Sequence, residues 1–190
     1  TFLKYFINSL IVSVSGVTLV ILVSSLMAFV FAKFSFKVTK GIFFLVVAGM
    51  MIPIHTTLIP IYSLSINIGV YDTLFALIGP YISFNIPVSV FIMTQFFKEM
   101  PKELDEAAKI DGGSLFLIYR KIVMPLSGPA VSTVGVYTFL TMWNEFVYAL
   151  VMIDTRSKKT LSLGIRDFYG FQTINIPAVL TAILVGSLPV

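Results

Sequence analysis

The sequence contains no cysteine and a single histidine, His55. Without cysteine the chain can form no disulfide, no zinc-thiolate site and no thiol nucleophile. One histidine rules out a His-rich metal site, and the sequence has neither the phosphate-binding pattern G-x-x-x-x-G-K-[ST] nor the nucleophile elbow G-x-S-x-G. We therefore expect no catalytic residue, no metal and no cofactor in this chain.

Charge is also scarce. Charged residues make up 12% of the chain, whereas hydrophobic residues make up 57% and the mean hydropathy is +0.98. A soluble domain has about 25% charged residues, and a helix needs roughly 20 apolar residues to cross a bilayer. Charge-free runs cover residues 5–32, 41–71, 73–97, 122–144 and 168–190. These runs indicate a protein that spans a membrane several times.

The apolar runs favour helices over barrel strands. Leu19–Val23 and Ile42–Val47 are uninterrupted hydrophobic stretches, whereas strands of a membrane barrel alternate between apolar and polar residues. Only these two structures satisfy backbone hydrogen bonds in lipid. The sequence therefore predicts an all-α membrane protein, a polytopic helical bundle with residues 1–190 as one domain.

We expect four full spans and one partial span. The full spans are residues 5–32, 41–62, 73–97 and 125–152. Pro53 and Pro60 are expected to interrupt the second of them. The last helix is expected to start near Pro177, since proline suits a first helical turn. From there to Val190 it would extend about 21 Å, too short to cross, so we expect this span to be truncated.

Orientation follows from lysine and arginine, which are more abundant in short cytoplasmic loops. The loops 33–40 and 98–121 alternate along the chain with the loops 63–72 and 153–176. The first pair of loops carries eight basic residues: Lys33, Lys37, Lys40, Lys98, Lys102, Lys109, Arg120 and Lys121. Lys4 and the other two loops carry five. This predicts that 33–40 and 98–121 are cytoplasmic and that 63–72 and 153–176 face outward.

The polar segment between the third and fourth spans predicts a helical hairpin outside the membrane. Pro101 suits a helix start, and Gly112 can take the left-handed conformation that ends a helix. Ser114 can then cap a second helix through about Val123, which Pro125 would terminate.

The residues of this segment resemble a known motif. Glu106-Ala107-Ala108-Lys109-Ile110-Asp111-Gly112 and Ile122-Val123-Met124-Pro125 fit the EAA loop of permease subunits of ATP-binding-cassette (ABC) importers, E-A-A-x3-G-x9-I-x-L-P, with Met124 in place of the usual leucine. The resemblance implies that a coupling loop of about residues 98–125 docks on a cytoplasmic ATPase. Its coupling residues would be Glu106, Ala107, Ala108, Asp111, Gly112, Ile122 and Pro125. The alternative is an ordinary amphipathic loop. A DNA-binding helix-turn-helix is excluded, because both ends are tethered to the bilayer and the second helix has few basic residues.

Further segments are similar to the sugar-importer branch, specifically the maltose-type second permease. They are Phe6–Leu10, Met51–Pro53, Pro60–Tyr62, Phe97–Pro101 and Trp143–Phe146. The resemblance implies a type I ABC importer transmembrane domain, with five of about six spanning helices present, in the cytoplasmic membrane. It also implies a second permease as heterodimer partner, an ATPase dimer that uses ATP and Mg, an extracytoplasmic binding protein and a sugar substrate. Separately, the net charge of +4 reflects the loops and leaves no basic face outside the bilayer, so we expect no nucleic-acid partner.

Polar residues inside the predicted spans leave alternatives open. His55, Thr56 and Thr57 follow Pro53, and they either line a sugar pathway or, through the threonine hydroxyls, satisfy the backbone carbonyls that the proline frees in the preceding turn. Asn85 is a kink residue or faces the pathway. Asn144 and Glu145 lie near the outer end of the fourth span, at a gate, at a binding-protein contact or at the membrane interface.

Three functional classes remain. The first is the permease of an ATP-driven sugar importer. The second is a permease of the same machinery for another solute, such as an osmolyte, a peptide or phosphate. The third is a secondary transporter that needs no ATPase, which would predict paired charges or broken helices at mid-membrane.

Overall fold

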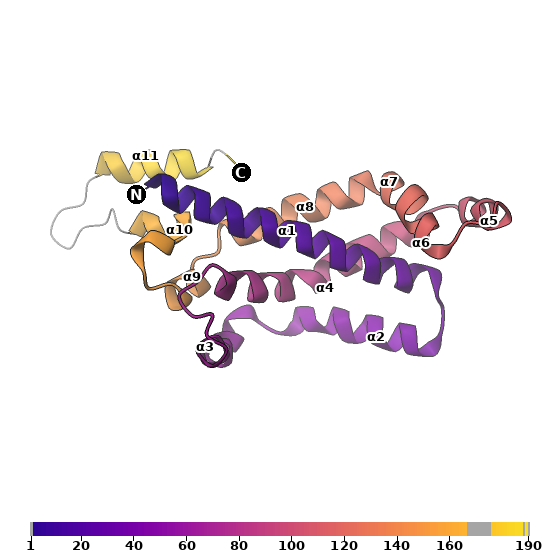
Figure 1. Ribbon diagram of the computed structural model, residues 1–190, viewed down its shortest axis with the longest axis horizontal. Coiled ribbons are helices and arrows are strands. Elements are labelled where there is room, and N and C mark those ends of the chain that lie inside the picture. The colour runs from indigo at the N-terminus through magenta and orange to yellow at the C-terminus, as the bar shows by residue number, and fades with distance from the viewer. Residues whose placement is uncertain (1, 167–175, 188, 190) are drawn as a thin grey trace. The chain divides into compact units, whose positions relative to one another are not determined.

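The computed structural model describes residues 2–166, 176–187 and 189, and within these ranges the chain is helical and has no β-strand (Figure 1). The elements are α1 (Phe2–Lys33), α2 (Lys37–Ala48), the 3-10 turns η1 (Gly49–Met51) and η2 (Ile54–Thr57), α3 (Leu58–Asn67), α4 (Phe75–Glu99), α5 (Lys102–Ile110), α6 (Leu115–Ile118), the π-helical turn η3 (Tyr119–Val123), α7 (Met124–Leu126), α8 (Gly128–Trp143), α9 (Val147–Met152), the 3-10 turn η4 (Arg156–Lys158), α10 (Leu161–Ile165) and α11 (Ile176–Ser187).

The predicted all-α membrane bundle is confirmed. Two single helices, α1 and α4, are long and apolar enough to cross a membrane, and there are four such spans if each of two broken helix pairs counts as one. The pairs are Lys37–Met51 with Ile54–Asn67, and Leu115–Leu126 with Gly128–Trp143. The described part of α11 runs from Ile176 to Ser187 and has Pro177 near its start, whereas residues 167–175 before it lie outside the described residues.

The prolines do not all break helices where the sequence suggested. Pro53 interrupts the second span, because Ile52 and Pro53 have extended backbone angles. The predicted interruption at Pro60 is wrong, since Pro60 lies in the first turn of α3, where its missing N–H is not needed. α4 continues through Pro80 and Pro87.

The predicted fourth span, 125–152, is wrong as a single helix. The helical chain bends by 74° between Leu115–Leu126 and Gly128–Trp143, and it is broken again before α9, which starts at Val147. Gly128 and Pro129 follow the bend, and both residues are poor continuers of a helix.

Two compact units can be described separately. The first comprises Thr1–Val17, Pro53–Ser83 and Thr138–Val190. Within it Tyr5, Trp143 and Leu161 form a buried cluster. A β-carbon at Gly164 would lie 2.1 Å from the Tyr5 ring, so only glycine permits this close packing of α10. Trp143 donates its indole N–H to the Gly186 carbonyl at 3.0 Å, which ties α11 to α8.

The second unit comprises Thr18–Ile52 and Phe84–Tyr137. Its part of α1 buries small residues, among them Ser24, Ser25 and Ala28. The Ser24 hydroxyl lies 3.6 Å from the Met93 sulfur of α4, which shows how closely the helices approach when small side chains face each other. That the chain is one domain over 1–190 stays a prediction.

Candidate functional site

The polar segment folds as the predicted hairpin. α5 runs from Lys102 to Ile110 with Pro101 at its N-cap, and it carries Glu103 and Asp105 in the first turn and Lys109 in the last. These charges complement the helix dipole at each end. None of the residues of this short helix is buried. The helix therefore has no core of its own, and its polar contacts with other elements hold it in place.

The turn after α5 depends on two glycines. Gly112 has a φ of +78°, in the left-handed region that glycine adopts most readily. At Gly113 an added β-carbon would lie 2.7 Å from the Ala108 carbonyl oxygen, which accepts the Gly113 N–H at 2.8 Å. Ser114 then caps α6 by accepting the Leu117 N–H at 3.3 Å. The predicted turn and cap are both confirmed.

The expectation that Pro125 ends the second helix is wrong. The helical chain continues from α6 through η3 into α7 and ends at Leu126. In η3 the backbone hydrogen bonds follow the wider π pattern over Tyr119–Val123, which includes Ile122. A π turn shifts the hydrogen-bond register by one residue, so the helix accommodates a proline, which cannot donate, in the first turn of α7.

The residues of α5 lie on two different faces. Lys102, Asp105, Glu106 and Lys109 line a cavity of about 330 Å³ in the second unit. The remaining coupling candidates Ala107, Ala108, Asp111, Gly112, Ile122 and Pro125 do not line this cavity, and Ala107, Asp111, Gly112 and Pro125 are exposed.

Large apolar side chains are exposed on the same hairpin. Ile110 is 86% exposed and Phe116 is 64% exposed, and neither lines the cavity. Large apolar side chains that are exposed on a polar segment are candidates for a protein contact. The hairpin can therefore contact a partner closely through Ala107, Gly112 and these two side chains.

An ion pair that the sequence did not reveal attaches the hairpin to a spanning helix. Lys33, in the last turn of α1, contacts the carboxylate of Asp105, and the two side chains are only 15% and 14% exposed. Near by, the hydroxyls of Ser25 and Tyr119 are 2.8 Å apart, and the Phe29 ring packs edge-on against Tyr119. The hairpin is thus held against α1 as well as joined covalently to α4 and α8.

The threonines after Pro53 satisfy backbone carbonyls. Thr56 donates to the Pro53 carbonyl at 2.7 Å, and Thr57 donates to the Ile54 carbonyl at 2.8 Å. The threonine hydroxyls thus bind backbone carbonyls, but those of Pro53 and Ile54 and not those of the turn before Pro53 that the structural interpretation named. His55 and Thr56 are both exposed.

The two asparagine candidates occupy different environments. Asn85 is 8% exposed within the continuous helix α4. Asn144 is exposed just after α8 and donates to the Leu140 carbonyl at 2.9 Å. It also lines a cavity of about 250 Å³ with Trp143, Leu161 and Ser162.

Glu145 caps a helix. Its carboxylate accepts the backbone N–H of Tyr148 at 2.8 Å and of Ala149 at 3.3 Å, at the start of α9. The Tyr81 hydroxyl also donates to this carboxylate. The Tyr148 hydroxyl lies 2.7 Å from that of Thr57. Glu145 therefore stabilises the break between α8 and α9, and the partners of its carboxylate come from two elements of the first unit, α4 and α9.

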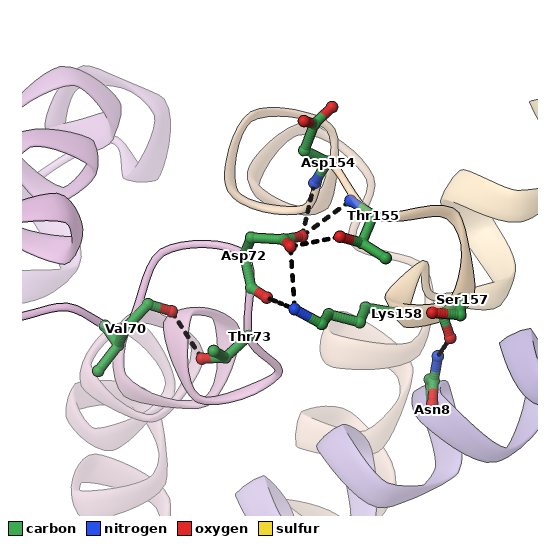
Figure 2. A network of polar contacts seen from close by, with 8 residues as sticks. All are labelled: Asn8, Val70, Asp72, Thr73, Asp154, Thr155, Ser157 and Lys158. Carbon is green, nitrogen blue, oxygen red and sulfur yellow. Dashed lines mark hydrogen bonds and ion pairs between the residues drawn. The ribbon is translucent and has the colours of Figure 1, made fainter.

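Asp72 is the centre of a polar network that sequence reasoning missed (Figure 2). One carboxylate oxygen accepts the N–H groups of Asp154 and Thr155 at 2.9 and 2.8 Å. The other accepts the Thr155 hydroxyl at 2.5 Å and the Lys158 ammonium at 2.9 Å. Lys158 also donates to the Asp72 carbonyl oxygen at 2.6 Å. The network joins the turn after α3 to the segment around η4.

The ionised form of the Asp72 carboxyl is strongly favoured over the protonated form. Burial by itself would raise the pKa of this carboxyl, but the hydrogen bonds from Thr155, Lys158 and Asp154 outweigh burial and hold the pKa well below its ordinary value. The backbone of Asp72 is left-handed, with a φ of +54°. Asn8 of α1 also binds this segment, donating to the Ser157 carbonyl at 3.0 Å.

Spanning helices with a polar hairpin between two of them define an integral membrane protein, and the comparisons with known proteins give its class. Residues 6–189 match the profile of the family described as binding-protein-dependent transport system inner membrane component. The chain is 48% identical over 188 residues to the ABC transporter permease protein ORF2 of Caldicellulosiruptor sp. (strain Rt8B.4), covering 99% of this chain and 68% of that protein. It is 31% identical to the diacetylchitobiose uptake system permease protein NgcG of Streptomyces coelicolor, covering 98% of this chain and 63% of that protein.

A solved structure has the same fold. It is the crystal structure of a bacterial ABC transporter involved in the import of the acidic polysaccharide alginate, with a TM-score of 0.79 and 22% sequence identity over 98% of this chain and 68% of that chain. The chain thus spans about two thirds of the length of these proteins. It belongs to the family of binding-protein-dependent transport system inner membrane components, the permeases of ABC importers. Members of this family are transport permeases and not catalytic enzymes.

Proposed function

We propose that the full-length protein is one of two permease subunits of an ATP-driven importer and forms part of the translocation path for a sugar or oligosaccharide. The observation that carries the proposal is the family match over residues 6–189. Relatives named for sugar uptake support the substrate class: NgcG, the melibiose/raffinose/stachyose import permease protein MelC of Bacillus subtilis, 31% identical, and the arabinooligosaccharides permease protein AraQ of Halalkalibacterium halodurans, 34% identical.

The partners follow from the same proposal. A second permease completes the path, an extracytoplasmic binding protein delivers the solute, and a cytoplasmic ATPase dimer uses ATP and Mg²⁺. This chain binds neither ATP nor Mg²⁺ and hydrolyses nothing by itself.

The hairpin is the proposed contact with the ATPase. Ala107, Ala108 and Gly112 have little or no side chain, so the partner's backbone can approach closely, and Ile110 and Phe116 offer exposed apolar area. Glu106 and Asp111 are exposed negative charges that a basic residue of the ATPase would bind. Ile122 and Pro125 would carry the second helix of the hairpin towards α8.

Movement of the ATPases would move this hairpin as a rigid body, because its turn is fixed by Gly112 and Gly113. The covalent links at Phe97 and Pro125 would tilt α4 and α8, and the Lys33–Asp105 ion pair would carry the same displacement to α1. Such a two-state element is what a switching mechanism requires.

The topology is part of the proposal. We propose that 33–40 and 98–121 are cytoplasmic and that 63–72 and 153–176 face outward; of the last segment, 167–175 lie outside the residues that the structure describes. The pairing of Lys33 with Asp105 supports placing the first two loops on one side. The pairing of Asp72 with Lys158 likewise supports placing the other two loops together.

A second candidate solute is an osmolyte. The osmoprotective compounds uptake permease protein GgtD of Synechocystis is 32% identical over 148 residues. Deleting the gene should abolish uptake of an oligosaccharide or sugar derivative at low concentration, while amino-acid and phosphate uptake stay intact. Normal growth on every sugar, together with lost osmolyte, peptide or phosphate uptake, would overturn the sugar assignment.

A further inference from the structure

The cavity of about 330 Å³ beside α5 combines positive charge with apolar walls. It lies between the last turns of α1 and α4, α5 and the start of α6, and four lysines line it: Lys33, Lys98, Lys102 and Lys109. Most of the remaining wall is apolar, and it includes Phe34 and Phe97. A cavity of this composition suits an amphiphile better than it suits a small hydrophilic ion.

The positive charge of the cavity is not balanced. Lys33 is paired with Asp105, which leaves Lys98, Lys102 and Lys109 against the single carboxylate of Glu106. None of these three lysines forms an ion pair within the part of the chain that the structure describes, and Lys102 and Lys109 are exposed. The net excess of positive charge favours an anion.

A second cavity continues the first along an apolar path. It has a volume of about 430 Å³ and shares Ala32, Phe34 and Lys98 with the first cavity. Its walls include the aromatic rings of Phe31, Phe43 and Phe44. The Lys98 ammonium lies 5.2 Å from the centre of the Phe43 ring, at the boundary between the charged and the aromatic parts.

We propose that the two cavities bind an anionic phospholipid, with the headgroup phosphate beside Lys98, Lys102 and Lys109 and the glycerol and upper acyl chain against Phe34 and Phe43. Lysine binds phosphate as a point charge. Basic pockets between membrane helices are suited to anionic headgroups, and the family to which the chain belongs is one of inner membrane components. Ala107 and Gly112 line neither cavity, so the bound lipid would leave them free for the ATPase, and Glu106 is the one coupling candidate that also lines the first cavity.

The test measures lipid binding directly and therefore does not depend on the solute or on coupling. The full-length permease is placed in nanodiscs of phosphatidylglycerol and phosphatidylcholine, and the lipids that it retains are counted by native mass spectrometry. We expect selective retention of phosphatidylglycerol. Lys102→Gln and Lys109→Gln should each weaken that retention about fivefold, the loss expected for one lysine near an anionic surface.

Two variants serve as controls. Lys121→Gln removes the same charge from the same hairpin but does not line either cavity, so it should retain the lipid. The double variant Lys102→Arg/Lys109→Arg keeps the charge and should also retain it, which separates lost binding from misfolding.

Equal loss in Lys121→Gln and in the cavity variants would overturn the proposal, because it would indicate general attraction to the surface. Displacement of the lipid by millimolar inorganic phosphate would overturn the lipid assignment in favour of a free anion. Loss of the bound lipid when the ATPase copurifies would show that a protein covers the cavity, and would also overturn the proposal.

Discussion

Lys33 at the end of α1 and Asp105 in α5 form an ion pair across 72 residues of sequence, and both side chains are largely shielded from solvent. The pair connects a spanning helix to the hairpin that carries the proposed ATPase contact. Removing one partner would leave the other charge partly buried and unpaired, which costs more than losing the attraction alone.

The first prediction concerns this ion pair. Lys33→Met and Asp105→Asn should each weaken the attachment of the hairpin by about 1–3 kcal/mol, and both should lower ATP-driven uptake more than the amount of protein in the membrane. The double variant Lys33→Asp/Asp105→Lys should recover part of the loss. Lys37→Met, an exposed control four residues away, should have no effect. If the charge swap is no better than either single variant, the pair does not attach the hairpin.

The second prediction concerns Gly112. No atom lies within 4 Å of the position that a β-carbon would occupy, so a substitution is penalised by its backbone angle and not by a clash. Gly112→Val should lower the stability of the turn by about 1–2 kcal/mol, because valine disfavours the left-handed backbone. Gly112→Asn should lower it less, since asparagine tolerates this conformation. Gly112→Asp should disturb ATPase binding more than Glu106→Ala, which removes one contact.

Copurification of the ATPase and uptake into vesicles would measure both effects. Full ATPase binding and full uptake in both Gly112→Asp and Glu106→Ala would show that this hairpin is not the coupling element, however well its sequence fits the motif.

The hairpin shows which features a sequence can predict. Gly112 and Ser114 act on neighbouring backbone groups, so their roles could be predicted from local order alone. The outcome at Pro60 depended on where α3 starts, and the outcome at Pro125 depended on a π turn earlier in the helix. Neither feature has a strong local signal.

The missed contacts are long-range. Tyr81 lies 64 residues before Glu145, and Thr155 lies 83 residues after Asp72. The sequence marked Glu145 as unusual because it is an ionisable residue in an apolar run, but nothing in the sequence identified its partners. For Asp72, a position in a polar turn between apolar segments gave no signal beyond that of a loop.

The third prediction tests topology with single cysteines, because residues 1–190 contain no native cysteine. Ser35 and Ser114 are exposed in the loops proposed to be cytoplasmic, and Asn67 and Ser157 are exposed in those proposed to face outward. Ser65 is only 3% exposed and is unsuitable as a probe. An impermeant maleimide should label Asn67→Cys and Ser157→Cys in intact cells. Labelling of Ser114→Cys under the same conditions would reverse the proposed orientation.

The fourth prediction concerns Asp72 and pH. Since its pKa is lowered in the folded protein, the stabilisation from its charge is complete above the ordinary carboxyl pKa of about 3.9 and is lost as pH falls through the lower native value. Asp72→Asn should therefore lower the melting temperature near pH 7, and its difference from the wild type should shrink only at strongly acidic pH. Asparagine tolerates the left-handed backbone, so this variant isolates the charge.

Lys158→Met provides the matched test of the same network, since it removes the cation and leaves the Thr155 and Asp154 donors in place. It should destabilise the protein less than Asp72→Asn. A melting temperature for Asp72→Asn equal to that of the wild type at pH 7 would contradict a stabilising role for the network.

The last prediction separates two roles for Glu145. The carboxylate accepts hydrogen bonds from two backbone N–H groups at the start of α9 and from the Tyr81 hydroxyl. A structural role therefore predicts that Glu145→Ala lowers the free energy of unfolding by about 1–3 kcal/mol. Glu145→Gln keeps one oxygen as an acceptor and should lose less. Tyr81→Phe removes one donor only and should be the mildest of the three variants. If Glu145 acts by capping α9, uptake and thermal stability should fall in the same order across this series. A Glu145→Gln protein of wild-type stability that transports nothing would instead assign the carboxylate a direct role in the pathway or its gate.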